Sequence, residues 1–517
     1  MVLGTASHVG KSLMVAALCR ILRQDGIRVA PFKAQNMALN SAATPDGLEI
    51  GRAQALQAEA AGVSASADMN PILIKPSSEC GAQIVVQGRV WGDSSASDYH
   101  RHRVKGLFPL VCASYERLAQ AYDFIVLEGA GSPAEFNLRD SDIVNMRMAQ
   151  AADARCVLVG DIDRGGVFAA ILGTLALLEP EERARIAGFV INKFRGDLAL
   201  LAPGVAEFER RIGLPCFGVV SYLRDIGLDE EDSVSLEAEP VARRPAWRDA
   251  EGPARRLRIA VIAQPYLSNA TDFDPLGREP DVELVYCGTP EALSGADVVI
   301  LPGTKTTLAT RSWLESAGFD PAIRSAPLVF GICGGLQMLG ERIDDPMGAE
   351  GGGSTRGLAL LRLRTTFAAT KVTMLASGRL TGDLFGTDAR GVPVRGYEIH
   401  VGETSAEGDA PPFALIQRAA DEGFRSDGAC SADGRIAGTY LHGIFDDDPF
   451  RHAFISAARK ARGLAPPLAL ASLREERERR IDRLAAHVRS SLDLTALIAS
   501  PPHVAQAGAQ KDNLPMP

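Results

Sequence analysis

The chain has 517 residues, 46% of them apolar and 23% charged, and a formal net charge of −9. This length corresponds to about three domains, and the composition is typical of a globular protein rather than a disordered or fibrous one. The negative charge gives no basic surface, so neither nucleic acid nor a membrane is expected as a partner. No apolar run approaches the roughly 20 residues of a membrane span, and the N-terminus has no signal-peptide pattern, so we expect a cytoplasmic protein.

Short apolar runs alternate with helical patterns along the first 225 residues. The runs lie at 27–32, 124–131, 154–163, 186–194 and 216–220. Continuous apolar strands between amphipathic helices indicate a parallel sheet covered on both faces. Residues 1–230 are therefore predicted to form an α/β domain. Only three residues precede Gly4, so the first strand is expected to be shorter than the usual five or six residues.

The sequence then loses its apolar periodicity. A charged and proline-bearing stretch at 231–256 is predicted to be a linker. The strand pattern returns in the runs 257–264, 282–287, 297–304, 328–335, 392–402 and 436–445. We predict a second α/β domain at 257–450, a helical segment at 451–498 and a disordered tail at 499–517.

The first candidate site is a glycine-rich turn near the N-terminus. Gly4 to Ser12 reads GTASHVGKS and precedes a helical pattern. Backbone N–H groups of such a turn surround phosphate oxygens, with Lys11 beside the terminal phosphates and the Ser12 hydroxyl available to Mg²⁺. Gly4 and Gly10 enclose five residues rather than the usual four. The loop is therefore a variant, and we expect it to bind ATP.

Other polar residues follow strands of the same predicted sheet. Glu128 ends the run 124–128, which places a carboxylate at the edge where open α/β sheets bind ligands. It is a candidate second magnesium ligand. Lys33 and Asn36 follow the second strand, and Asn192 ends another strand where its amide could contact a purine. Position alone leaves the roles of these three residues open.

The second candidate site is a cysteine at a tight turn. The eight cysteines contain no Cys-x-x-Cys pair, which argues against a disulfide framework or a zinc ribbon. Cys333, in LVFGICGGLQML, lies between a strand and a helix and is flanked by glycines that permit a strained turn. The helix N-terminus favours the thiolate. The pattern predicts a nucleophile.

A nucleophilic thiol needs a base and an oxyanion site. His442, at another strand end, is the favoured base. The turn LPGTKTT after the strand 297–301 offers main-chain N–H groups near Gly303, joined by the amide of Gly334. His400 is a rival base, for which we favour a structural or substrate-positioning role. The combination predicts acyl transfer through a thioester.

The motifs together resemble the cobyric acid synthase family, the glutamine-dependent amidases of cobalamin biosynthesis. The similarity covers residues 1–460 and is strongest in GTASHVGKS, APFKAQNMALNS, EIGRAQALQAEAAG, MNPILIKP, LEGAGSPAEFNLRDSDIVNM, GDIDRGGVFA, GICGGLQMLG, RGYEIHVG and GTYLHGIFD. The resemblance implies a dethiobiotin-synthetase-like P-loop domain followed by a class I glutamine amidotransferase domain. It implies no oligomeric state.

The same resemblance implies a reaction. Family members amidate the b, d, e and g carboxylates of adenosylcobyrinic acid a,c-diamide with L-glutamine as nitrogen donor and ATP hydrolysis at each step. A carboxylate repels nucleophiles and has no good leaving group, so phosphorylation to an acyl phosphate makes chemical sense. The corrinoid and glutamine are thus the expected partners, and the resemblance places Asp140 near the activated carboxylate.

One part of the amidotransferase pattern is missing. The wider class carries His-Pro-Glu, whereas this chain has His442-Gly443-Ile444. The carboxylate that would orient His442 is therefore not identified, and Asp446 is a candidate without further support.

Two other kinds of protein share parts of this pattern. A cobyrinic acid a,c-diamide synthase shares both domain types, but the segments QNMALNS and SPAEFNLRDSDIVNM favour cobyric acid synthase. A P-loop switch of the partitioning type would use the first domain alone, and it would have no use for the Cys333 domain.

Overall fold

The computed structural model describes residues 1–77, 81–95, 104–224, 226–228, 252–406, 410–419, 421, 423–468 and 472–499. The chain forms two compact units that are not consecutive in sequence. The first comprises Met1–Ala34, His100–Ile226 and Arg483–Pro517, and the second comprises Gln35–Tyr99 and Gly227–Asp482. No helix in the described ranges is long and apolar enough to span a bilayer.

The first unit is built on a parallel sheet. Its strands are β1 (Val2–Gly4), β2 (Val29–Phe32), β9 (Phe124–Leu127), β10 (Cys156–Asp161), β11 (Ile186–Phe194) and β12 (Cys216–Ser221). β1, β10, β11 and β12 pair in that order, β2 pairs with β9, and a parallel bridge between Val2 and Glu128 joins the two groups. Although β1 has three residues, all are buried and in register with β10.

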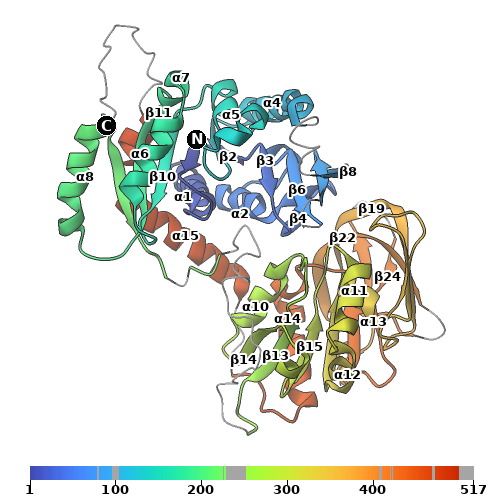
Figure 1. The fold of residues 1–517 in the computed structure, drawn as a ribbon. Coiled ribbons are helices and arrows are strands. Elements are labelled where there is room, and N and C mark those ends of the chain that lie inside the picture. The colour runs from blue at the N-terminus through green and yellow to red at the C-terminus, as the bar shows by residue number, and fades with distance from the viewer. Residues whose placement is uncertain are drawn as a thin grey trace. The chain divides into compact units, whose positions relative to one another are not determined.

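Helices surround this sheet (Figure 1). Those with buried residues or strand contacts are α1 (Lys11–Gln24), α4 (Val104–Ala121), α5 (Met146–Ala151), α6 (Val167–Leu177), α8 (Leu198–Ile212) and α16 (Leu494–Ala499). The short helices α7 (Pro180–Arg183) and η3 (Phe136–Ser141) have no buried residue. α1 contacts β1, β2 and β9, whereas α6 contacts β10. Leu158, Phe189 and Ile171 are buried in the core between sheet and helices, as expected for continuous apolar strands.

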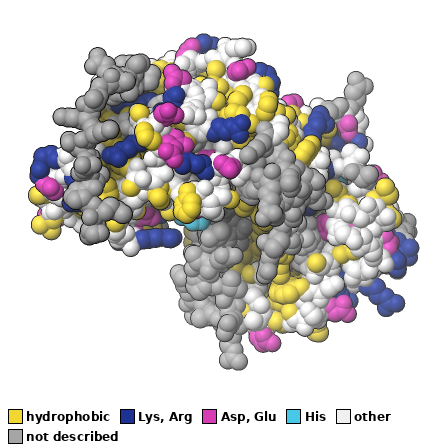
Figure 2. Space-filling model, turned by 45° about the horizontal axis from the view of Figure 1, so that its top comes forward, with side chains coloured by type: hydrophobic (Ala, Val, Ile, Leu, Met, Phe, Trp, Pro, Cys, Tyr) yellow, Lys and Arg dark blue, Asp and Glu magenta, His cyan; other side chains and the backbone are white. Residues whose placement is uncertain are grey.

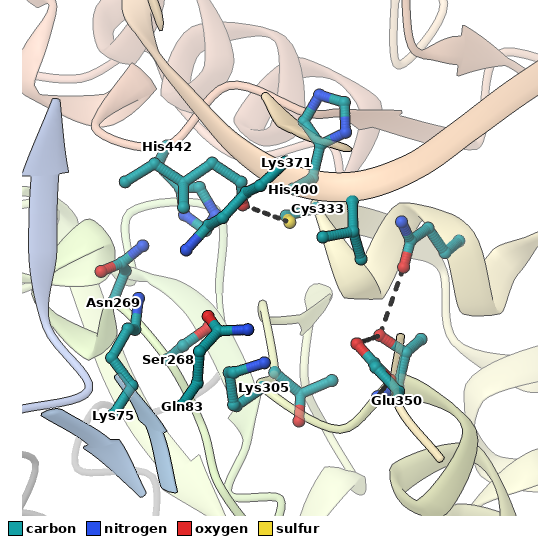
Figure 3. A pocket seen from close by; sticks show the side chains of 15 residues that line it. Lys75, Gln83, Ser268, Asn269, Lys305, Cys333, Glu350, Lys371, His400 and His442 are labelled. Atoms are coloured by element: carbon teal, nitrogen blue, oxygen red, sulfur yellow. Dashed lines mark hydrogen bonds between the residues drawn. The ribbon is translucent and has the colours of Figure 1, made fainter. Parts of the chain in front are cut away.

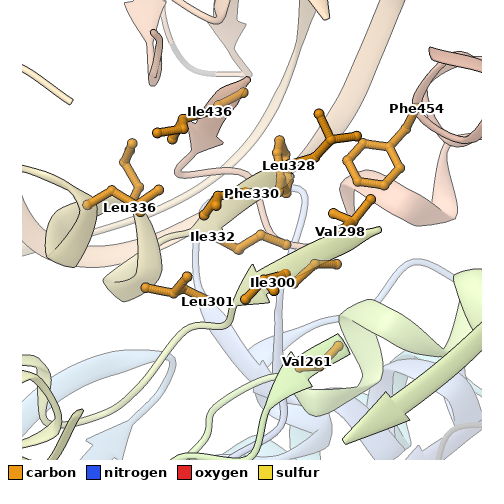
Figure 4. Packing of buried hydrophobic residues seen from close by; sticks show 14 of the residues in the cluster. Val261, Val298, Ile300, Leu301, Leu328, Phe330, Ile332, Leu336, Ile436 and Phe454 are labelled. Carbon is orange, nitrogen blue, oxygen red and sulfur yellow. The ribbon is translucent and has the colours of Figure 1, made fainter. Parts of the chain in front are cut away.

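The second unit contains another mostly parallel sheet. The strand order is β14 (Val282–Cys287), β13 (Leu257–Ile262), β15 (Val298–Leu301), β16 (Leu328–Ile332), β26 (Ile436–Thr439) and β25 (Ala429–Cys430). Only the pair β25–β26 is antiparallel. Val298, Phe330 and Ile332 lie in its buried core, and Phe454 of α14 (Asp448–Ala461) packs on Phe330 with ring centroids 5.2 Å apart (Figure 4).

A second sheet in this unit is mainly antiparallel. It contains β17 (Arg342–Asp345), β18 (Gly353–Arg356), β19 (Leu363–Leu380), β22 (Pro393–Ala406), β23 (Ala414–Arg418) and β24 (Arg425–Asp427). The apolar run 392–402 lies here in β22, paired with β19, and not among the parallel strands. Helices of this unit include α10 (Asp274–Gly277), α11 (Thr307–Ser316), α12 (Phe319–Ser325) and α13 (Gly334–Leu339).

Residues 35–99 also belong to the second unit, whereas the sequence analysis assigned them to the first domain. They form the sheet β3 (Gln35–Met37), β6 (Ile72–Pro76), β7 (Gly81–Val86) and β8 (Arg89–Ser95), the hairpin β4 (Ser41–Ala43) and β5 (Glu49–Gly51), and helix α2 (Arg52–Ala61). The Tyr397 hydroxyl donates to the Ser41 carbonyl at 2.9 Å. The segment therefore contacts β22 directly.

The described chain beyond residue 450 is mainly helical. After α14 follow α15 (Leu473–Ser491) and α16, and the apolar stripe Ile481, Leu484 and Val488 is buried. The predicted tail beyond Ala499 and residues 231–251 of the predicted linker lie outside the described residues. On the face shown in Figure 2, basic and acidic side chains are scattered among apolar ones.

Candidate active site

The glycine-rich loop connects β1 to α1 in the first unit. Gly10 precedes α1 with φ 96°, a backbone conformation that glycine adopts without strain. A Cβ at this position would lie 2.3 Å from Asn192 Nδ2. Lys11 Nζ donates to the carbonyls of Ala6 at 3.0 Å and Gly131 at 3.1 Å. The lysine ammonium is thus held over the loop.

Three predicted residues meet at the carboxyl end of β9. Ser12 Oγ donates to Glu128 Oε1 at 2.8 Å, and Lys33 Nζ lies 3.1 Å from the same oxygen. Lys33 and Glu128 are both buried. Since a buried carboxylate requires a charge partner, Lys33 supplies the countercharge that Glu128 needs at this position.

The donor set at this point suits magnesium. Ser12 and Glu128 offer a hydroxyl and a carboxylate oxygen, hard ligands that Mg²⁺ accepts while taking its other ligands from phosphates and water. Among the residues that the structure describes, no group of three or more His, Cys, Asp or Glu forms a self-sufficient metal site.

The other two predicted residues of the first unit lie apart from this Ser12–Glu128–Lys33 cluster, one at the glycine-rich loop and one on η3. Asn192, at the end of β11, donates its amide to the Val9 carbonyl at 2.8 Å and so supports the loop backbone. Asp140 is exposed on η3. Within the described part of the chain, no hydrogen bond or ion pair joins it to the loop.

Cys333 occupies a strained turn in the second unit. It lies between β16 and α13 with φ 51° and ψ −108°. A Cβ on Gly335 would lie 1.9 Å from the Leu301 carbonyl oxygen, and one on Gly331 would lie 2.8 Å from the Leu336 nitrogen. The flanking glycines therefore let the turn pack closely on β15 and on its own helix, which fixes the thiol at the end of the sheet.

His442 follows β26, the neighbour of β16, and is oriented by a carboxylate. Its Nδ1 lies 2.7 Å from Asp272 Oδ2, while the Gly443 N–H donates to Asp272 Oδ1 at 2.9 Å. His442 and Tyr397 exchange two backbone hydrogen bonds. Asp272 thus holds the ring, and Tyr397 holds the backbone that carries it.

The electrostatics of this pair favour the imidazolium. Burial lowers the pKa of His442, but attraction to Asp272 and Cys333, with hydrogen bonds to both, outweighs it and raises the pKa to about 10. Cys333 and His442 line the same pocket, and the Cys333 thiol donates to the Ile399 carbonyl at 3.6 Å. His442 is thus a cationic partner in the pocket that Cys333 lines.

The turn predicted to hold an oxyanion lies beside both groups. A Cβ on Gly303 would lie 2.9 Å from His442 Cε1, and one on Gly334 would lie 3.2 Å from the Thr304 nitrogen. The Ser268 N–H donates to the Gly303 carbonyl at 3.0 Å, which holds the turn in place. Main-chain amides near Gly303 and Gly334 are therefore adjacent, as an oxyanion site requires.

Around the thiol lies a pocket made entirely of second-unit residues (Figure 3). His400 lines it, but its Nε2 lies 3.1 Å from Glu398 Oε1 and its Nδ1 lies 2.8 Å from the Gly402 carbonyl oxygen. Both ring nitrogens are occupied, which agrees with a structural role. Lys75 and Gln83, from strands β6 and β7, form another wall.

Asp272 is the functional residue that the sequence analysis missed. It lies on the 3-10 helix η4 (Ala270–Phe273), beyond the strand 257–262, and no spacing motif distinguishes it from Asp274. Asp446, the candidate considered, instead pairs with Arg52 at 3.0 Å.

Comparison with known protein families finds one matching domain in each of the two parts of the chain. Residues 1–235 match the CobQ/CobB/MinD/ParA nucleotide binding domain, and residues 258–450 match the CobB/CobQ-like glutamine amidotransferase domain. Fold and site thus define a glutamine amidotransferase joined to a P-loop nucleotide-binding domain.

Full-length relatives identify the family. Cobyric acid synthases of Chloroflexus aurantiacus, Klebsiella pneumoniae and Salmonella heidelberg are 48%, 48% and 49% identical over 495, 506 and 501 residues. The matches cover 95–96% of this chain and 96–97% of the relatives. The chain belongs to the cobyric acid synthase family, whose members are ligases that contain a glutamine amidotransferase domain. The family and fold class predicted from the motifs are confirmed.

Proposed function

We propose that the chain amidates the b, d, e and g carboxylates of adenosylcobyrinic acid a,c-diamide, using L-glutamine and ATP, to give adenosylcobyric acid. The observation that supports this most is the presence in one chain of a Gly-Lys-Ser loop and a Cys333–His442–Asp272 site. Amide formation needs an activated acid and a nitrogen nucleophile, and each site supplies one of them.

The second unit would release the nitrogen. The Cys333 thiolate attacks the amide carbon of glutamine, and the negative oxygen that develops accepts hydrogen bonds from amides near Gly303 and Gly334. His442 gives its proton to the departing nitrogen, so that ammonia leaves and a glutamyl thioester remains. Water, deprotonated by His442, then hydrolyses the thioester to glutamate and restores the thiol. Asp272 keeps the ring oriented throughout.

The first unit would activate the acid. A carboxylate oxygen of the corrinoid attacks the γ-phosphorus of ATP, which gives an acyl phosphate and ADP. Ammonia then attacks the acyl carbon and phosphate leaves. Lys11 stabilises the charge on the phosphates, while Lys33 pairs with Glu128 and Asn192 supports the loop. Asp140 is assigned to substrate handling.

Ser12 and Glu128 would hold Mg²⁺. When bound, the ion neutralises phosphate charge and so favours transfer to the carboxylate. ATP and magnesium are therefore the small-molecule requirements of this proposal.

The test is product analysis with purified protein, ATP, magnesium, glutamine and the corrinoid. Mass spectrometry counts the amide groups gained, and gain at b, d, e and g is expected. Cys333→Ala should abolish glutamine use but allow amidation with ammonia, whereas Lys11→Ala should stop amidation with either nitrogen source. Amidation of cobyrinic acid at only a and c would contradict the proposal.

A further inference from the structure

A pocket of the second unit, apart from the one around Cys333, is lined mainly by arginines. It lies among α2, α10, the 3-10 helix η6 (Ile444–Asp446) and the start of α15, and its volume of about 330 Å³ admits a small molecule. Its lining residues all belong to the second unit. The charged ones are Arg52, Glu59, Arg278, Asp446, Arg474 and Arg477. The proposed reaction gives no role to this arginine pocket.

One face of α2 forms a wall of the arginine pocket. Arg52, Ala55 and Glu59 follow one another at spacings of three and four residues, which places them on the same side of the helix. The short side chain of Ala55 leaves space between the two long charged ones. The three residues belong to the motif EIGRAQALQAEAAG, from which neither reactive centre takes a residue.

Two of the arginines are held in place by the two acids of the pocket. Arg52 Nη2 lies 3.0 Å from Asp446 Oδ2, and Arg477 Nε lies 2.7 Å from Glu59 Oε2. The side chains of Arg52 and Arg477 are only 12% and 16% exposed. A guanidinium has five N–H donors, of which one carboxylate accepts at most two in a fork. Each ion pair therefore fixes an arginine at the pocket without using all of its donors.

The start of α15 adds positive charge to the same pocket. Arg474 and Arg477 lie in its first two turns, where the helix N-terminus carries a partial positive charge. The acids of the first turn, Glu475 and Glu476, are each paired with an arginine four residues further on. The helix dipole and two arginines of α15 therefore favour an anion at this point.

The arginines reach the pocket from three different helices. Arg52 lies on α2, Arg278 follows α10, and Arg474 and Arg477 lie on α15. A planar carboxylate is matched by one guanidinium fork in its own plane. A phosphoryl group instead presents three acceptor oxygens toward several sides and carries more charge. Donors that surround a cavity suit the second kind of anion.

We propose that the arginine pocket binds a phosphoryl group, either of free phosphate or of a phosphorylated small molecule, through Arg52, Arg474 and Arg477. It is a second phosphate site, in the unit that carries Cys333, whereas the phosphate loop belongs to the first unit. Binding at this site requires neither glutamine hydrolysis nor amidation.

The test is calorimetric titration of inorganic phosphate at constant ionic strength. The parent protein carries Lys11→Ala, so that the phosphate loop contributes little. We expect saturable binding in this parent, and a dissociation constant at least about tenfold higher when Arg474→Gln or Arg477→Gln is added, because a charge-assisted hydrogen bond is lost.

Arg479→Gln is the matched control. Arg479 lies on the same helix but outside the lining of the pocket, with its side chain 69% exposed and 3.7 Å from Glu475. Its replacement removes the same charge and should leave phosphate binding as tight as in the parent. Arg474 is exposed, so Arg474→Gln should change Tm by no more than about 2 °C, measured by circular dichroism.

Three probes identify the occupant. Binding of phosphate alone indicates the free ion, whereas tighter binding of AMP that Arg474→Gln also weakens indicates a phosphorylated molecule. Succinate that binds more tightly than either would overturn the assignment in favour of a carboxylate site. The proposal is also wrong if phosphate and AMP show no saturable binding up to about 20 mM, or if Arg474→Gln and Arg479→Gln bind them equally. Because no turnover is measured, a failure of the proposed amidation would leave these results unchanged.

Discussion

His442 Nδ1 and Asp272 Oδ2 lie 2.7 Å apart although 170 residues separate them in the chain. The other oxygen of Asp272 accepts the N–H of Gly443, the residue after the histidine. One carboxylate thus fixes both the ring and the backbone that carries it. Because Nδ1 faces Asp272, Nε2 is directed toward the substrate side, where a base for Cys333 is needed.

Replacement of Asp272 by asparagine should lower the pKa of His442. The carboxylate offsets the burial that disfavours the imidazolium, and its loss should remove the cation that His442 contributes to the pocket of Cys333. We expect the rate of Cys333 alkylation by iodoacetamide at pH 7 to fall at least tenfold, about 1.4 kcal/mol. In the variant this rate should recover at high pH, where the thiol ionises without help. An unchanged rate profile would show that Asp272 has no part in activating the thiol.

Replacement of Asp446 by asparagine should have a much smaller effect. Its carboxylate pairs with Arg52 at 3.0 Å rather than with His442, and a partly exposed ion pair contributes little. Glutaminase activity should remain within about tenfold of the wild type, a difference of about 1.4 kcal/mol in barrier. A loss as large as that of the Asp272 variant would instead give Asp446 an orienting role.

Replacement of Gly10 by alanine should disable the phosphate loop. The left-handed backbone costs an alanine about 1–2 kcal/mol, and its Cβ would lie 2.3 Å from Asn192 Nδ2. We expect ATP affinity, measured by calorimetric titration, to fall more than tenfold. Gly26→Ala is the matched control, because it has φ 82° but no atom within 4 Å of the new Cβ. This control should lose a similar amount of stability and keep its ATP affinity.

Replacement of Asn40 by alanine should impair the glutaminase through Asp272. Asn40 Oδ1 accepts the Ala270 N–H at 3.1 Å, and Ala270 begins the turn that carries Asp272. Loss of the acceptor leaves a buried N–H unpaired, at a cost of about 1–3 kcal/mol. Glutamine hydrolysis should fall about tenfold while amidation with added ammonia falls less. Asn40→Asp, which retains an acceptor, should recover part of the activity; equal loss of both activities would indicate general destabilisation.

Local patterns in the sequence predicted the two reactive centres. Glycines flank Cys333 and precede Lys11 because a side chain there would collide with residues packed against the turn. A Cβ on Gly331, for example, would lie 2.8 Å from the Leu336 nitrogen. Strand ends predicted Glu128 and His442, because neighbouring parallel strands bring their carboxyl ends to one edge. These signals lie within a few residues of the groups concerned.

Other features had no such local signal. Asp272 reaches His442 only through the pairing of β13, β15, β16 and β26, and Glu350 reaches the Cys333 pocket through a loop fixed by Asp345. Asn192 ends its strand as expected, but its amide contacts Val9 of the loop. Residues 35–99 interrupt the first α/β pattern and join the second unit. Contacts across such sequence separations depend on packing, which periodicity does not encode.

By itself, the sequence determined the chemistry: a phosphate loop, a thiol nucleophile, a histidine base and the family to which their motifs belong. Turn geometry and strand periodicity are short-range properties, so neighbouring residues specify them. Tertiary structure alone decided which carboxylate orients His442, which acid enters the Cys333 pocket and where residues 35–99 pack. Those choices follow from the burial of charged groups, because a buried charge is stable only beside a partner that the whole fold brings to it.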